Sequence, residues 1–395
     1  MAVRIQPARR MTDIQAPIMP IIADLIAANP DTITLGQGVV SYGPPPAAIA
    51  HTKRFGETLN EHRYQAVAGI PELIEQIDLK LANENSIGRD GREVVVTAGA
   101  NMAFLSAILA IADPGDEIIL LRPFYFNHEM AIRMIGCIPV LVDTDENYQP
   151  VLGAIEEAIT SRTRAVVTVS PNNPTGATYS KQSLIDINSL CGSRGIFHIS
   201  DEAYEYFVYD DASHFSAASL PGSEGHTISL YSLSKAYGFA SWRIGFMAIP
   251  TLLRDSVIKV QDTNLICAPV VSQQAAVAAL RVGRSYCDEQ VHVLSEVRRL
   301  ALGLLGELDD VVTIPPAKGA FYFFLRINRD VDAMDVARYL IEKHKVAVVP
   351  GDTFGTVGGS YLRVSYGALD KGTVSAGIAR LVEGLSEMPN SLARS

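Results

Sequence analysis

The chain reads Ser232-Leu233-Ser234-Lys235-Ala236-Tyr237-Gly238 directly after the apolar run Thr227–Tyr231. An apolar run of this length before a small-residue turn is typical of a strand buried inside a sheet. A lysine at the end of such a strand is costly to desolvate, so its pKa shifts readily and its amine can form a Schiff base with an aldehyde. A lysine on a surface loop would leave the same pattern, so this stretch alone keeps both interpretations open.

Apolar runs of the same kind recur along the first 250 residues, with helical patterns such as Asn101–Ala112 between them. They are rich in Val and Ile with almost no alternation, as expected of strands buried on both faces. Alternation of strands and helices predicts an α/β domain with a mostly parallel seven-stranded sheet. The predicted strands are Glu93–Thr97, Glu117–Leu121, Pro139–Asp143, Ala165–Val169, Ile196–Ser200, Thr227–Tyr231 and Ile244–Ile249.

After about residue 284 the pattern changes to a long polar helix, Tyr286–Leu308, followed by short strands at Ala320–Ile327, Val346–Pro350 and Tyr361–Tyr366. We predict a smaller α+β domain here, against which the opening segment with Pro44-Pro45-Pro46 packs. The large domain would span residues 46–284, and the small domain would comprise residues 1–45 and 285–395. A length of 395 residues agrees with two domains, because single cores seldom grow this large.

The composition disfavours several classes of protein. A formal net charge of -10 argues against binding to nucleic acid or to anionic membrane. The apolar stretch Ala16–Ala28 is broken by Pro17, Pro20 and Asp24, so it is neither a signal core nor a membrane span. The four cysteines are scattered and no histidines stand at metal-ligand spacing, so we predict no metal site and a cytoplasmic location with reduced thiols.

Polar residues follow several of the predicted strands. Arg243 comes soon after Lys235, and a guanidinium, a lysine and two serine hydroxyls at one strand end suit a phosphate dianion. Asp201-Glu202-Ala203-Tyr204 by itself could be a helix cap, and Pro171–Gly176 by itself a turn. Thr97–Asn101 is a small-residue loop before a helix, where N–H groups bind phosphate well, but it lacks the spacing of a nucleotide-binding fingerprint.

Taken in order, these motifs resemble the class I/II aminotransferases, which are fold type I enzymes dependent on pyridoxal 5′-phosphate. The resemblance runs from about Leu35 to Arg363 and is most specific in the Asn-Pro-Thr-Gly and Ser-x-Ser-Lys…Arg motifs. It implies transfer of an amino group from an L-amino acid to a 2-oxo acid, in a large cofactor-binding domain followed by a small domain. The motifs in chain order are Gly99-Ala100-Asn101, Pro123-Phe124-Tyr125, Asn173-Pro174-Thr175-Gly176, Asp201-x-x-Tyr204, Ser232-x-x-Lys235, Arg243 and Arg363.

The resemblance implies a role for each matched residue at the cofactor. Lys235 would bind it covalently and move the proton at the substrate Cα, and Asp201 would pair with the pyridine nitrogen, keeping the ring an electron sink. Tyr204 and Asn173 would bond the ring hydroxyl oxygen, and Tyr125 would stack on the ring. The residues expected to hold the phosphate are Gly99, Ala100, Asn101, Ser232, Ser234 and Arg243.

Other matched residues point to the substrate and to a partner subunit. Arg363 would clamp the substrate α-carboxylate, since planar bidentate pairing suits a carboxylate. Gly38 and Tyr42 are expected beside the substrate, with Asn173. Tyr64 matches a tyrosine that relatives donate across a dimer interface, which implies a homodimer. His128 is either a histidine that supports Asp201 or a lone surface histidine.

The amino donor is less well indicated. Aspartate-selective relatives place a cation near the side-chain carboxylate, but this chain has Asn101 where some carry lysine, and Gln261-Asp262-Thr263-Asn264 offers no arginine. Burying a second carboxylate without a partner is costly, which disfavours aspartate. The segments 35–40, 125–127 and 204–207 resemble plant aromatic and methionine aminotransferases, so an aromatic amino acid or methionine is favoured, with aspartate/2-oxoglutarate as the alternative.

Two rival functions remain open at this point. Fold type I also hosts lyases, cyclases and other carbanion enzymes on the same constellation, and fold does not dictate reaction. A non-catalytic binding module, like the aminotransferase-like portion of some transcription regulators, would not need Lys235, Asp201 and Arg363 together, and all three are present.

Overall fold

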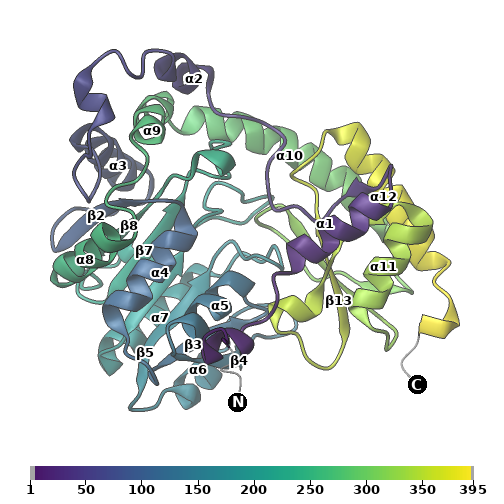
Figure 1. Ribbon diagram of the computed structural model, residues 1–395. Helices are drawn as coiled ribbons and strands as arrows, with labels where there is room; N and C mark the ends of the chain where they lie inside the picture. Colours follow the sequence, from purple (N-terminus) through teal and green to yellow (C-terminus); the bar gives the residue numbers. More distant parts are fainter. Residues whose placement is uncertain (1–4, 393–395) are drawn as a thin grey trace.

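A seven-stranded sheet forms the centre of the larger part of the molecule in the computed structural model, which describes residues 5–392 (Figure 1). The strand order is β2-β8-β7-β6-β5-β3-β4. Each predicted strand is present, within one or two residues of its expected bounds. The strands are β2 Arg92–Thr97, β3 Glu117–Arg122, β4 Ile138–Asp143, β5 Thr163–Val169, β6 Phe197–Asp201, β7 Thr227–Ser232 and β8 Gly245–Pro250.

Strand β8 is the antiparallel member of this sheet, and the others run parallel to one another. Gly245, its first residue, pairs with Thr97 at the end of β2 and with Ser232 at the end of β7. The carboxyl ends of β2 and β7 therefore lie at the same edge as the amino end of β8. This arrangement brings Arg243 back beside Lys235.

Both faces of the sheet are buried, which explains why the strands lack polar alternation. Ile118 and Leu120 of β3 pack with α4 (Ala100–Ile111), α5 (Phe126–Met134) and α8 (Arg254–Asn264) on one face. Ile119 and Leu121 of the same strand pack on the other face with α6 (Leu152–Ala158) and α7 (Lys181–Arg194). Helices α2 (Pro46–Thr52), α3 (Pro71–Glu84) and α9 (Val270–Val282) pack together at the β2 edge.

After α10 (Arg284–Leu305) the chain forms a four-stranded antiparallel sheet in the order β12-β13-β10-β9. Its strands are β9 Val312–Thr313, β10 Tyr322–Ile327, β12 Val349–Pro350 and β13 Ser360–Ser365, and the helices are α11 Ala333–His344 and α12 Lys371–Ser386. The expected strand 346–350 is divided, because β11 (Val346–Ala347) pairs with β1 (Ile33–Thr34) in a separate sheet, whereas β12 pairs with β13.

The opening segment contacts both parts of the molecule: α1 (Ile18–Ala28) packs on α11 and β12, whereas the turn Arg9–Thr12 lies against α5 of the larger part (Figure 1). The division of the chain at residues 46 and 284 stays a prediction, and the first four and last three residues of the predicted small domain lie outside the described part.

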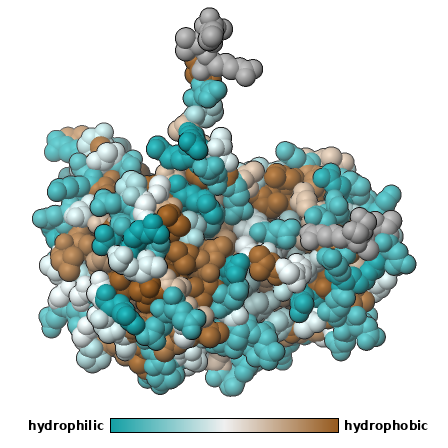
Figure 2. Space-filling model, turned by 90° about the horizontal axis from the view of Figure 1, so that it is seen from below, coloured by the Kyte–Doolittle hydropathy of each residue, from teal (hydrophilic) through white to brown (hydrophobic). Residues whose placement is uncertain are grey.

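The surface seen from below mixes hydrophobic groups with hydrophilic ones, and the largest brown areas lie near the middle of that face (Figure 2). Between residues 5 and 392, no helix has both the length and the hydrophobicity needed to cross a membrane. The four cysteines are free thiols, and three of them are buried.

Candidate active site

The loops that leave the carboxyl ends of the parallel strands surround a cavity of about 560 Å³. Ligand sites of open α/β sheets lie at this edge, because successive loops diverge there. The C-terminal part and the opening segment close the cavity from the other side. The predicted site residues that line it are Gly38, Ala100, Asn101, Tyr125, Asn173, Asp201, Tyr204, Ser232, Ser234, Lys235, Arg243 and Arg363.

Lys235 extends into this cavity from the turn after β7. Its Nζ donates to the carbonyl oxygen of Gly38 at 2.5 Å. Burial, followed by the guanidinium groups of Arg363 and Arg243, lowers the pKa of the Lys235 ammonium from 10.5 to about 8. No carboxylate among residues 5–392 forms an ion pair with it, so nothing offsets this shift beyond the more distant Asp201. A neutral, nucleophilic amine is therefore accessible near physiological pH.

Asp201 is the last residue of β6 and is almost completely buried. One carboxylate oxygen lies 3.1 Å from Nε2 of His128, and the other accepts the backbone N–H of Ala203 at 3.0 Å. His128 is 2 % exposed and its ring stacks on Phe104 with centroids 3.9 Å apart. The surface interpretation of His128 is therefore excluded, and this histidine orients the carboxylate.

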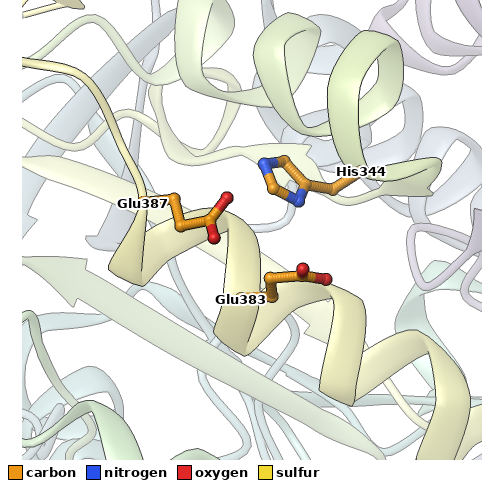
Figure 3. A group of neighbouring side chains, drawn as sticks. All are labelled: His344, Glu383 and Glu387. Carbon is orange, nitrogen blue, oxygen red and sulfur yellow. The ribbon is translucent and has the colours of Figure 1, made fainter.

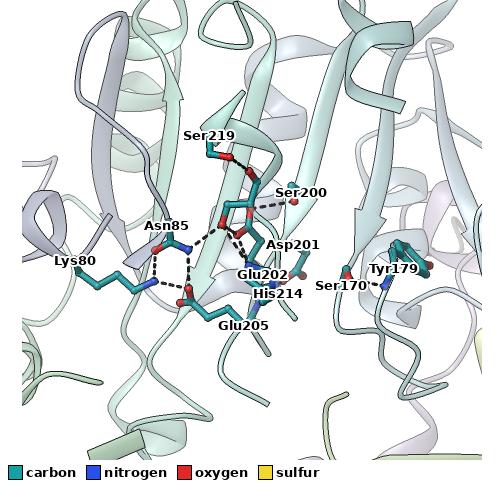
Figure 4. Close-up of polar contacts among 12 residues, drawn as sticks. Lys80, Asn85, Ser170, Tyr179, Ser200, Asp201, Glu202, Glu205, His214 and Ser219 are labelled. Atoms are coloured by element: carbon teal, nitrogen blue, oxygen red, sulfur yellow. Dashed lines mark hydrogen bonds and ion pairs between the residues drawn. The ribbon is translucent and has the colours of Figure 1, made fainter. Parts of the chain in front are cut away.

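A network of polar side chains holds the segment after Asp201 in place (Figure 4). Glu202 accepts hydrogen bonds from Ser200 at 3.1 Å and from Ser216, and it contacts Nε2 of His214 at 2.9 Å. Glu205 pairs with Lys80, and Asn85 bonds the same carboxylate at 2.8 Å. These contacts hold both ends of the turn that carries Tyr204, because buried charges keep their geometry when they are paired.

Arg363, Asn173 and Tyr204 form a connected group in the cavity lining. Arg363 donates through Nη1 to Oδ1 of Asn173 at 2.9 Å and through Nη2 to the carbonyl of Gly36 at 2.7 Å. Asn173 in turn donates through Nδ2 to the hydroxyl of Tyr204 at 3.4 Å. Nε of Arg363 is buried without a hydrogen-bond partner, and buried polar groups normally have one. A bound anion would supply that partner.

Arg243 and the start of α4 form a cradle for a second anion. Gly99 caps α4 with φ of 80°, and Ala100 and Asn101 at the start of that helix, whose first N–H groups have no partner within the helix, line the cavity. Arg243 donates to the carbonyl of Ala240 at 2.7 Å and to that of Ala98 at 3.4 Å. A Cβ added to Gly99 would collide with the Arg243 guanidinium, so the glycine lets the two segments meet.

The charges that line the cavity do not balance. Three cations, Lys235, Arg243 and Arg363, face a single carboxylate, Asp201, which is already bonded to His128. Like charges gathered in a concave site attract ligands of the opposite sign. The cavity therefore suits a ligand, or a pair of ligands, with more than one anionic group.

Three predicted residues lie outside the cavity lining. Tyr42 turns away and its hydroxyl lies 3.2 Å from the carbonyl of Lys235, so it supports the lysine turn from outside. Gly99 sits beneath Arg243, and Tyr64 is 79 % exposed on the surface. Conversely, several lining residues were not predicted as site residues. Gln37, Val39, Phe126 and Asn127 lie in the segments that resemble the aromatic and methionine subgroup, whereas no motif pointed to Pro17, Met19, Ala240 or Tyr322.

A group of possible metal ligands occurs elsewhere, on α11 and α12. Ligand atoms of His344, Glu383 and Glu387 lie within 4.8 Å of one another (Figure 3). Both glutamates are exposed, and Nε2 of His344 lies 3.0 Å from the hydroxyl of Tyr339. None of these residues lines the cavity, and the absence of a metal site stays a prediction.

Comparison with known proteins identifies the family. The sequence profile described as aminotransferase class I and II matches residues 30–381. The chain belongs to the class I and II aminotransferases. It is 35% identical to a probable aspartate/prephenate aminotransferase of Aquifex aeolicus, covering 92% of this chain and 94% of that protein. It is 32% identical to an aromatic aminotransferase of Arabidopsis thaliana, covering 96% of each chain.

Solved aminotransferase structures share the fold. An aspartate aminotransferase mutant of Thermus thermophilus superposes with a TM-score of 0.87 at 28% identity, over 96% of this chain and 100% of that one. An aromatic aminotransferase of Pyrococcus horikoshii gives a TM-score of 0.82 at 32% identity, over 93% and 99%. The expected fold type I architecture is thereby confirmed.

Aminotransferases of this class depend on pyridoxal phosphate, and the cavity of this aminotransferase fits that cofactor. Arg243, Ser232, Ser234 and the start of α4 offer donors for the phosphate. At the other end a buried carboxylate, Asp201, meets the requirement for a partner of a protonated pyridine nitrogen. The orphaned Nε of Arg363 then remains for a substrate carboxylate.

Proposed function

We propose that the chain transfers an amino group from an L-amino acid to a 2-oxo acid, using Lys235 as its proton carrier. The observation that supports this most is the lysine itself, a cavity-facing amine with a pKa of about 8 and no paired carboxylate among residues 5–392. Bound pyridoxal phosphate supplies an electron sink for negative charge at the substrate Cα. Nζ of Lys235 would take the proton from the substrate Cα and deliver it to C4′ of the cofactor, so that the substrate can leave as a 2-oxo acid.

The other residues hold the two ligands in place. Asp201, oriented by His128, holds the proton at the pyridine nitrogen, and Tyr204 with Asn173 bonds the ring hydroxyl oxygen. Tyr125 stacks on the ring. Phosphate binding falls to Gly99, Ala100, Asn101, Ser232, Ser234 and Arg243, of which Gly99 acts by making room for the arginine.

Arg363 binds the substrate α-carboxylate. Its guanidinium is held by Asn173 and Gly36, so its unpaired Nε–H has a fixed direction. Once its carboxylate is fixed, the substrate would have its Cα–H bond perpendicular to the plane of the cofactor ring. This orientation favours loss of a proton over loss of carbon dioxide. We place Gly38 next to the substrate, because its carbonyl contacts Lys235.

We further propose a homodimer in which Tyr64 contacts the phosphate of the partner subunit. Its large exposure in a single chain supports this, since aromatic side chains exposed to this degree are uncommon unless they meet a partner. A cytoplasmic location remains a prediction from the sequence.

For the amino donor we favour an aromatic amino acid or methionine. The part of the lining that is left for a side chain includes Pro17, Met19, Val39 and Phe126, all apolar. The cations that line the cavity within residues 5–392 are Lys235, Arg243 and Arg363, and each already has a role, so a second substrate carboxylate lacks a partner. The aromatic aminotransferase among the relatives agrees with this choice.

Aspartate is the alternative donor, because several relatives carry the name aspartate aminotransferase. A panel of amino acids assayed with 2-oxoglutarate and with pyruvate, read as rates of oxo-acid formation, separates the two. Preference for phenylalanine, tyrosine or methionine is expected, and a clear preference for aspartate would contradict our choice of donor.

Lyase or cyclase chemistry is the alternative reaction on the same constellation. Incubation with amino acid alone distinguishes them, because a transaminase converts its cofactor to pyridoxamine phosphate in one half-reaction. We expect loss of the visible absorbance and one equivalent of oxo acid per site. Continuous release of ammonia or of a leaving group, without pyridoxamine phosphate, would support the alternative.

A further inference from the structure

Tyr322, the first residue of β10, touches two groups of the site that come from different parts of the chain. Its hydroxyl lies 2.7 Å from the hydroxyl of Tyr204. Its ring faces the Arg363 guanidinium at 4.7 Å, and the ring of Phe354 lies 5.1 Å from the same guanidinium. Together with Asn173, which bonds both Tyr204 and Arg363, these contacts form a closed ring of four side chains.

Either phenol could be the donor of the hydrogen bond between them, but their surroundings favour one direction. Tyr322 is completely buried, and Tyr204 is its hydrogen-bond partner within residues 5–392. Leaving a buried O–H without an acceptor is costly, which favours Tyr322 as the donor and Tyr204 as the acceptor. Tyr204 also accepts from Asn173. Both of its lone pairs are then used, and its own proton is left to point into the cavity.

Both phenols keep their protons at neutral pH. Burial raises the pKa of Tyr322 to about 12, although Arg363 opposes the shift, and burial also raises the pKa of Tyr204 well above its ordinary value. Each hydroxyl therefore keeps its proton at neutral pH and can donate it.

Tyr322 is also fixed in place by its surroundings. A Cβ added to Gly38 would lie 2.6 Å from the Tyr322 hydroxyl, so the opening segment presses directly on it. The same glycine accepts the hydrogen bond of Lys235 at 2.5 Å. The phenol thus has little freedom to turn away from Tyr204, because interiors packed this closely leave no alternative position.

We propose that Tyr322 is a positioning residue that directs the Tyr204 proton toward the cofactor ring oxygen and holds the Arg363 guanidinium for the substrate carboxylate. Its hydroxyl serves the first task and its ring serves the second. The inference rests on the proposed function, and it assigns to Tyr322 no contact with the reacting atoms.

Two variants separate the tasks. Tyr322→Phe keeps the ring beneath Arg363 and removes the donor to Tyr204, whereas Tyr322→Leu removes both. Tyr148→Phe is the matched control, because Tyr148 packs on Phe324 of the same strand with ring centroids 6.0 Å apart but does not line the cavity. All are measured as the enzyme loaded with pyridoxal phosphate, and thermal unfolding verifies that each is folded.

The first measurement is the pH midpoint of the visible absorbance change of the bound cofactor. For Tyr322→Phe we expect an upward shift of about half to one pH unit, because a weaker donor at the ring oxygen lets the cofactor keep its proton to higher pH. Tyr148→Phe should keep the wild-type midpoint. An unshifted midpoint in Tyr322→Phe, or an equal shift in the control, would overturn the proposed action through Tyr204.

The second measurement is the separation of KM from kcat for the amino acid. Tyr322→Leu should raise KM about tenfold, because the aromatic ring that contacts the Arg363 guanidinium is lost. Tyr322→Phe keeps that ring and should keep KM within about twofold. Equal KM values in both variants would refute the role of the ring. If Tyr322→Leu does not fold, Tyr322→Phe decides through its midpoint. A wild-type protein that gains no visible band with pyridoxal phosphate would refute the proposed function and this inference together.

Discussion

Two lysines, the buried Lys80 and the partly buried Lys235, have opposite surroundings. Lys80, on α3, is 6 % exposed and pairs with Glu205 and with Oδ1 of Asn85 at 2.6 Å, while its Nζ lies 4.8 Å from the centre of the Tyr231 ring. Lys235 has one carbonyl oxygen as its partner, two guanidinium groups nearby and an open cavity in front. The carboxylate of Glu205 makes Lys80 structural, whereas Lys235 has no such partner and is reactive because burial and two guanidinium groups lower its pKa.

The largest effect of any substitution is expected at Lys235. Lys235→Ala removes the amine that binds the cofactor and carries the proton, so we expect loss of the visible band of the holoenzyme and a fall in kcat of about 10⁴-fold or more. Absorbance spectra and steady-state rates measure both. Lys80→Ala is the control, whose folded fraction should keep the band. A Lys235→Ala protein that still binds pyridoxal phosphate covalently would show that another residue is the nucleophile.

Loss of Lys80 should affect stability instead. Lys80→Met leaves the carboxylate of Glu205 buried without its cation, which lowers the free energy of unfolding by about 3–5 kcal/mol. Urea unfolding measures this change. The double variant Lys80→Met/Glu205→Leu should recover most of the loss, because an apolar pair needs no counter-charge. If the double variant recovers none of the lost free energy of unfolding, the ion pair itself stabilises the fold, and the loss in Lys80→Met does not come from the unpaired carboxylate of Glu205.

Measurements over a range of pH test whether the amine of Lys235, which has no paired carboxylate, has a lowered pKa. The pKa of Lys235 is lowered to about 8, so its neutral fraction rises with pH and levels off above about pH 8. The rate at which apoenzyme regains its visible band from pyridoxal phosphate should therefore rise about tenfold per pH unit and then flatten. Free Nα-acetyl-lysine under the same conditions gives the baseline of an ordinary amine. A rise that continues to about pH 10 would contradict the lowered pKa.

The smallest effect is expected at the phosphate cradle, where Arg243 is a further cation without an ion pair among residues 5–392. In Gly99→Ala the new Cβ meets that guanidinium at a backbone φ of 80°, so the dissociation constant of pyridoxal phosphate should rise about tenfold. Gly115→Ala is the matched control, because Gly115 has φ of 93° and open space around its Cβ position. Equal dissociation constants in both variants would show that the contact with Arg243 does not matter for binding.

The sequence predicted the large sheet well because its strands are buried on both faces. Runs such as Ala165–Val169 carry no competing periodicity, and the polar residues just after them could be assigned to one edge without coordinates. The order of motifs then gave the position of Lys235, Asp201 and Arg363, all of which line one cavity.

Residues that act through distant partners could not be predicted in the same way. Tyr322 looks like one more aromatic residue of an apolar strand, and its partner Tyr204 lies 118 residues away. Lys80 and Glu205 likewise carry no local mark of their pairing. Tyr42 follows a similar logic, since whether it faces the cavity or the backbone of Lys235 depends on how the opening segment crosses the lysine turn.

The carbonyl oxygens that meet Arg363 and Lys235 belong to Gly36 and Gly38, and both precede the first strand of the large sheet. A truncation that removed the opening forty residues would therefore alter the cavity itself. It would remove one carbonyl partner from Arg363 and the carbonyl partner of Lys235, together with the part of the cavity wall that contains Met19. An affinity tag joined ahead of the exposed stretch 5–13 would leave all of these contacts intact.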